Sequence, residues 1–116
     1  MQVVNLTKRT VLADRAGLAD NFGRRLAGLL KERGRYLEAG KGLVIHPCNG
    51  VHTLFMRYPL DVAFVDREGR VVRQIPGLLP YRFSPMVTKA AAVVELPAGM
   101  LALSRTEVGD RLITLI

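Results

Sequence analysis

Apolar residues recur with a period of two over much of the second half of the chain, and this pattern restricts the fold more than any other feature. Between positions 60 and 65, Leu60, Val62 and Phe64 alternate with Asp61, Ala63 and Val65, which predicts a strand with these two sets on opposite faces. Further short runs at 43–45, 51–56, 70–75, 90–96 and 111–116 also have strand character. A domain built mainly from β-structure follows.

The N-terminal third adds one hairpin and one helix to this prediction. Apolar residues at 3–6 and 11–12 flank a polar turn and predict two paired strands. An apolar stripe made of Leu18, Phe22, Leu26, Leu29 and Leu30 then follows a helical period, with Asp20 as N-cap and Gly34 at the end. The turn at 66–69 joins two strands, residues 76–85 form a loop with a short strand at 81–83, and 97–104 make one or two helical turns.

Length and composition set the size and class of the fold. With 116 residues, 49% of them hydrophobic and 23% charged, the chain suits a single domain over residues 1–116. We expect an α+β fold, in which about seven short strands form a mainly antiparallel sheet that curls into a partial barrel or sandwich. One main helix packs against this sheet.

Charge and cysteine content narrow the environment and the partners. One cysteine and an N-terminus without signal-peptide character predict a cytoplasmic protein with no membrane span. The net charge of +7 is concentrated around residues 24–41, so weak nucleic-acid binding through this face is one hypothesis. A solvated basic face is the favoured interpretation, because no nucleic-acid motif is present. The sequence indicates no oligomeric state.

One stretch, residues 46–61, carries most of the side chains that can do chemistry. It holds both histidines, the single cysteine and Asp61. A pocket bordered by His52, Met56, Arg57 and Asp61 could bind a small polar ligand such as a sugar. Ligand binding by a small module is therefore our leading functional hypothesis. We predict no cofactor and no metal for this ligand-binding module.

Two chemical alternatives and one structural interpretation of the same stretch stay open. Cys48 activated by His52, with Asp61 orienting the imidazole, would make a thiol hydrolase. A metal-assisted hydrolase would take His46, Cys48 and His52 as ligands, completed by Asp61 or Met56, although the spacing is not a standard zinc pattern. In the structural interpretation, Asp61 accepts from loop N–H groups or pairs with Arg57, and Cys48 is a small buried apolar residue. Whether the chain is an enzyme is left undecided.

Several separated blocks also resemble a known family. Val-His-Thr at 51–53, Met-Arg-Tyr-Pro-Leu-Asp at 56–61 and Glu-Leu-Pro-Ala-Gly at 95–99 are similar, in this order, to the prokaryotic family named domain of unknown function 192. The resemblance extends from about residue 19 to the C-terminus and implies a small, mainly β domain without an established activity. It also favours a structural or ligand-binding role for the corner formed by residues 59–61 over cysteine chemistry.

Overall fold

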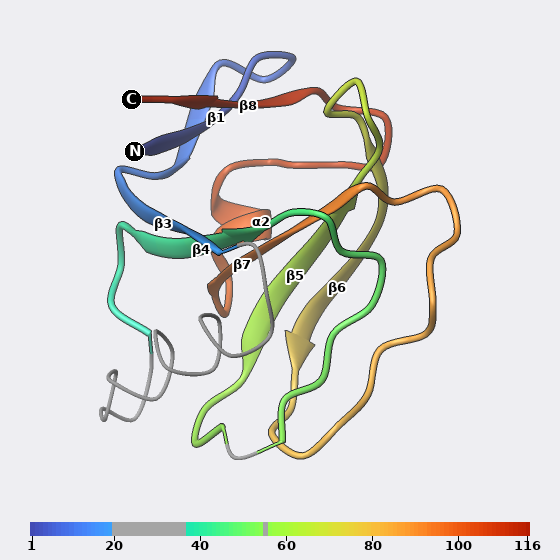
Figure 1. Ribbon diagram of the computed structural model, residues 1–116. Helices are drawn as coiled ribbons and strands as arrows, with labels where there is room; N and C mark the ends of the chain where they lie inside the picture. Colours follow the sequence, from blue (N-terminus) through green and yellow to red (C-terminus); the bar gives the residue numbers. More distant parts are fainter. Residues whose placement is uncertain (20–36, 55) are drawn as a thin grey trace.

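The computed structural model describes residues 1–19, 37–54 and 56–116 (Figure 1). Eight strands and one short helix lie in this part of the chain. They are β1 (Gln2–Asn5), β2 (Thr10–Ala13), β3 (Arg15–Ala19), β4 (Lys41–Ile45), β5 (Leu60–Val65), β6 (Val71–Leu78), β7 (Ala92–Pro97), α2 (Met100–Leu103) and β8 (Leu112–Leu115). The helix predicted over residues 20–34 falls outside the described residues. Leu18, the first residue of its predicted apolar stripe, lies in β3.

The strands form two separate sheets, neither of which closes into a barrel. A three-stranded sheet has the order β2-β1-β8, and a five-stranded sheet has the order β3-β4-β7-β5-β6. All neighbouring pairs are antiparallel except β3 and β4, which run parallel. The fold is therefore a small β-rich domain with mostly antiparallel pairing, and its five-stranded sheet is mixed.

Strand β5 lies inside the five-stranded sheet and is buried along its whole length. As the alternation predicts, its two sets of side chains enter different cores. Val62 and Phe64 join a cluster with Ile45, while Ala63 and Val65 join a cluster that includes Val3 of the three-stranded sheet. The second cluster thus fills the space between the two sheets; Figure 1 shows the three-stranded sheet above the five-stranded one, and Leu101 of α2 also belongs to this cluster.

Two predicted segments differ from the structure, and both differences have a physical cause. The prediction of a strand at 51–56 is wrong, because the segment makes only one isolated bridge, from His52 to Phe83. The Thr53 side chain and backbone bond instead to the irregular 79–82 loop, at Leu79, Tyr81 and Arg82. The segment at 81–83 likewise contributes only that bridge and is not a strand.

Strand β6 continues through Pro76 and Gly77, where the sequence predicts the start of a loop. Strand β3 forms where the sequence predicts no strand. Pro76 is tolerated in β6 because this strand lies at an edge of the sheet, where a missing N–H leaves no neighbour unpaired. The small residues Ala16, Gly17 and Ala19 give β3 little strand character, yet it pairs with β4 over five residues. No helix in the described part of the chain is long and apolar enough to span a membrane.

Candidate functional site

The carboxylate of Asp61 is held entirely by backbone amides of the protein. The side chain is 1% exposed. Its Oδ1 accepts from the N–H of Gly77 at 2.8 Å, and its Oδ2 accepts from the N–H groups of Gly99 at 3.0 Å and Leu101 at 2.9 Å. One carboxylate therefore ties the end of β6 and the start of α2 to β5, which is the structural role that the sequence left open.

The other residues of the predicted ligand pocket lie in different surroundings. Met56 is buried in the core cluster on the opposite face of β5 from Asp61. Arg57 is exposed, and His52 is half-buried with its ring centroid 5.9 Å from that of Phe83. The His52 Nδ1 accepts a hydrogen bond from the Leu54 N–H at 3.2 Å. The structure does not bring Met56 and Asp61 to one side of the sheet, and ligand binding by these four residues stays a prediction.

The residues of the thiol hypothesis bond to different parts of the chain. The Cys48 thiol is free of any disulfide and donates to the Gly50 carbonyl, with 3.1 Å between Sγ and O. Asp61 is occupied by its three amides, as described above. Within the described residues, no three His, Cys, Asp or Glu side chains gather in a group that could hold a metal ion. A hydrolase function therefore gains no support from the arrangement of Cys48, His52 and Asp61.

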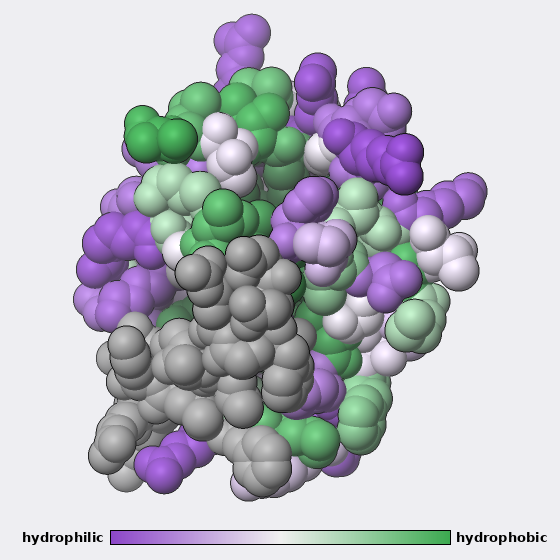
Figure 2. Space-filling model, in the orientation of Figure 1, coloured by the Kyte–Doolittle hydropathy of each residue, from purple (hydrophilic) through white to green (hydrophobic). Residues whose placement is uncertain are grey.

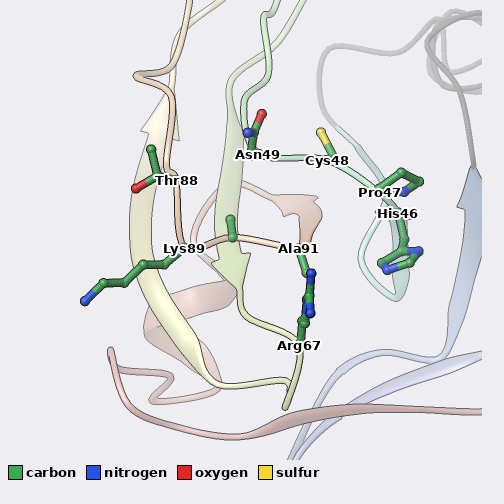
Figure 3. Close-up of a pocket in the computed structure, with 9 residues that line it drawn as sticks. His46, Pro47, Cys48, Asn49, Arg67, Thr88, Lys89 and Ala91 are labelled. Atoms are coloured by element: carbon green, nitrogen blue, oxygen red, sulfur yellow. The ribbon is translucent and has the colours of Figure 1, made fainter.

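An open cavity of about 660 Å³ lies elsewhere, where three distant segments meet. Its lining consists of residues 46–49, Arg67 and residues 88–91, and we call it the basic pocket. Figure 3 shows Arg67 extending from below toward Ala91, with His46 beside it and Lys89 reaching outward on the far side. The volume lies within the range of roughly 300–1,000 Å³ that is typical of small-molecule sites.

Backbone hydrogen bonds fix the three segments that form the basic pocket. The Cys48 N–H donates to the Ala91 carbonyl at 3.0 Å, and the Ala91 N–H donates to the carbonyl of Val65 at 2.8 Å. The Val87 N–H also donates to the Asn49 carbonyl at 2.8 Å. These bonds connect the segment after β4, the segment before β7 and the end of β5, so the pocket is part of the folded framework.

Arg67 is presented by the tight turn between β5 and β6. The Asp66 side chain accepts from the N–H groups of Glu68 at 3.0 Å and Arg70 at 2.9 Å. Gly69 completes the turn with φ of 83°, a left-handed conformation that glycine adopts without strain. The turn predicted at 66–69 is confirmed, and it places the guanidinium at the rim of the basic pocket.

The charged side chains among the described lining residues of the basic pocket are all positive. Among its nine described lining residues are Arg67, Lys89 and His46, and none of the nine is an Asp or Glu. Within the described part of the chain, these three side chains make no hydrogen bond or ion pair. The cationic side chains of Arg67 and Lys89 attract anions, and an arginine can bind a carboxylate or phosphate with two parallel hydrogen bonds. The geometry therefore suits an anionic ligand.

A second polar cluster has a structural role. The Asp110 carboxylate accepts from Asn5 Nδ2 at 3.0 Å, Lys8 Nζ at 2.7 Å and the Glu107 N–H at 3.0 Å. Burial alone would raise the pKa of Asp110, but the hydrogen bonds from Asn5, Lys8 and Glu107 outweigh it and hold the pKa below its usual value. This cluster fastens the β1–β2 hairpin to the C-terminal loop.

Comparison with known proteins places the chain in a family. The family model of domain of unknown function 192, described as "Uncharacterized ACR", matches residues 3–114. The chain belongs to this family. It is 34% identical to a UPF0127 protein of Pyrococcus furiosus over 115 residues, covering 95% of each chain. It is 30% identical to a UPF0127 protein of Pyrococcus horikoshii over 111 residues, covering 95% of this chain and 96% of that one.

Two solved structures share the fold of this family member. A protein of unknown function from Novosphingobium aromaticivorans superposes with a TM-score of 0.79 at 24% identity, covering 97% of this chain and 82% of that one. A protein from Sinorhizobium meliloti described as a putative transcription regulator gives a TM-score of 0.74 at 21% identity, with 97% and 89% coverage. The family has no established function, and these likenesses establish the fold alone.

Sequence reasoning missed Arg67 and Lys89 as functional candidates. Both lie outside the 46–61 stretch, and no local motif connects them to His46. The available signal is weak: an arginine at the tip of a predicted hairpin turn, and a lysine in a Pro-rich loop. Of the basic face predicted at 24–41, only residues 37–41 are described, so this prediction is left untested.

Proposed function

We propose that this protein is a small-ligand-binding module and that its ligand carries an anionic group held in the basic pocket. The observation that carries this proposal is the gathering of three basic side chains, His46, Arg67 and Lys89, around one cavity; among the described residues these side chains have no hydrogen-bond or ion-pair partner, and no carboxylate lines the cavity. Arg67 and His46 would contact the anion directly. Lys89 reaches outward in Figure 3 and would act at longer range by raising the local positive potential.

The alternatives have less support. A sugar bound beside His52 and Arg57 stays a prediction, as does a cytoplasmic location. A thiol hydrolase would need Cys48 and a general base directed at each other, whereas the Cys48 thiol donates to the Gly50 carbonyl. Binding without chemistry is therefore the function that the geometry supports best.

The experiment is a titration with inorganic phosphate at low ionic strength, followed by amide chemical shifts in two-dimensional NMR. We expect saturable shifts for Cys48, Asn49, Ala90 and Ala91, because these amides surround the cavity. Added sodium chloride should weaken the binding, since salt screens exposed charges over about 10 Å at 0.1 M. Shifts centred on Asp61 or His52, or no saturable shift at any amide, would overturn the proposal.

A further inference from the structure

A second cavity, of about 610 Å³, adjoins the basic pocket and differs from it in character. The linings of the two cavities share His46 and Arg67. Apart from its polar end, the second cavity is lined mainly by apolar side chains from both sheets, such as Val3, Val44 and Leu112. These three side chains are 1%, 7% and 6% exposed and belong to the core that fills the space between the two sheets, so they form the floor of an open groove, which we call the apolar slot.

The apolar slot opens to the surface beside the chain ends. Leu18 of the edge strand β3 lines the slot and is 65% exposed. Ile116 lines it as well and is fully exposed. Figure 2 shows apolar residues gathered on the side of the molecule where the two termini lie. Exposed aliphatic side chains at the rim of a groove with an apolar floor favour an apolar occupant.

The charges at the shared end select the chemistry of that occupant. The Arg67 guanidinium attracts an anion and the His46 ring can donate a hydrogen bond to it, but Glu68 and Asp66 also line this end of the slot. Asp66 Oδ1 is occupied by the turn amides, and Glu68 is exposed. Because these two carboxylates lie on the slot side of Arg67, a head group that faces the slot suits this end better as a single carboxylate than as a group of higher negative charge. The described lining of the basic pocket, by contrast, holds no acidic residue.

We propose that the ligand is a long-chain carboxylate, with its head group at Arg67 and His46 and its hydrocarbon chain in the apolar slot. This proposal rests on the proposed function, because it takes the basic pocket as the anion site. It adds that affinity grows with chain length, since each methylene that enters the slot leaves water.

The test measures the binding of acetate, hexanoate, octanoate and decanoate by calorimetry, at concentrations below micelle formation. We expect the affinity to rise roughly two- to fourfold for each methylene buried, the upper value corresponding to full burial. Octyl glucoside, which has an eight-carbon chain and a neutral head, should bind more weakly than octanoate. Equal or tighter binding of octyl glucoside would overturn the carboxylate assignment.

Two matched variants separate the slot from the rest of the surface. Leu18→Gln replaces an apolar side chain at the rim of the slot by a polar one of similar size. Leu79→Gln makes the same change at an exposed leucine that lines neither cavity. We expect L18Q to weaken decanoate binding at least threefold and leave phosphate binding unchanged. L79Q should change neither. Equal effects of the two variants on decanoate would overturn the proposal.

The outcomes also distinguish this proposal from the proposed function. If phosphate and acetate bind at the basic pocket but affinity does not grow with chain length, the proposed function holds and the long-chain ligand is refuted. If phosphate, acetate and decanoate all fail to bind there, both are refuted. Decanoate binding that survives the removal of the Arg67 charge refutes the placement of the head group.

Discussion

Replacing Asp61 with asparagine tests whether this carboxylate is part of the framework. The isosteric Asp61→Asn keeps one oxygen but turns an NH₂ group toward amides that donate to the carboxylate in the wild type. Three N–H groups depend on this side chain, which is 1% exposed. Hydrogen bonds to a charged group contribute about 1.5–3 kcal/mol each, and such contributions are not additive. We expect D61N to lower the free energy of unfolding by about 3–5 kcal/mol.

The assay is urea unfolding followed by far-UV circular dichroism, because the chain contains no tryptophan for fluorescence. A loss of this size is a large part of the roughly 5–15 kcal/mol that stabilises a typical domain. Asp66→Asn is the control, because the retained Oδ1 can still accept both turn amides. We expect D66N to cost less than about 1 kcal/mol. A D61N variant as stable as D66N would refute the structural role and return Asp61 to the candidates for ligand binding.

Three further predictions concern stability and the thiol. The pKa of Asp110 is lowered from 3.8 in the folded state, so the stability that the Asp110 carboxylate contributes should be complete above pH 3.8 and be lost as the pH falls through the folded pKa. In urea titrations between pH 7 and 2, Asp110→Asn should not show this acid-dependent loss of stability. Gly69→Ala should lower the free energy of unfolding by at least about 2 kcal/mol, because a Cβ there would lie 2.5 Å from a backbone oxygen of β8. Gly109 also has a positive φ but has open space around it, so Gly109→Ala should lower the free energy of unfolding by only about 1 kcal/mol. Equal losses would contradict the steric argument. Cys48→Ser should keep the hydrogen bond to Gly50 and leave phosphate affinity unchanged within twofold, whereas a thiol-dependent function would be lost.

Much of the fold follows from period-two patterns, because these patterns coincide with burial. In β5 the alternation correctly assigns Val62 and Phe64 to one core and Ala63 and Val65 to the other. The turn at 66–69 and the short helix within 97–104 also follow from local signals. Such elements need no knowledge of their partners, since hydrophobic period and turn chemistry define them locally.

The failures arise where a distant partner decides the structure. Residues 51–56 alternate like a strand, but Thr53 bonds to the 79–82 loop, and a sheet partner is absent among the described residues. Strand β3 forms without β-branched residues because β4 offers it a parallel edge. The basic pocket is the clearest case. His46, Arg67 and Lys89 meet through the β4–β7–β5 arrangement, which no spacing in the sequence reveals.

The central claim is that the Arg67 guanidinium binds an anion, and one ratio of dissociation constants tests it most directly. Phosphate affinity is measured for Arg67→Gln and for Arg73→Gln, an exposed β6 arginine outside the basic pocket, so that both variants lose the same charge. Loss of an exposed ion pair of about 1 kcal/mol corresponds to roughly a fivefold change. We predict that R67Q binds phosphate at least fivefold more weakly than R73Q. Equal dissociation constants for the two variants would contradict the claim.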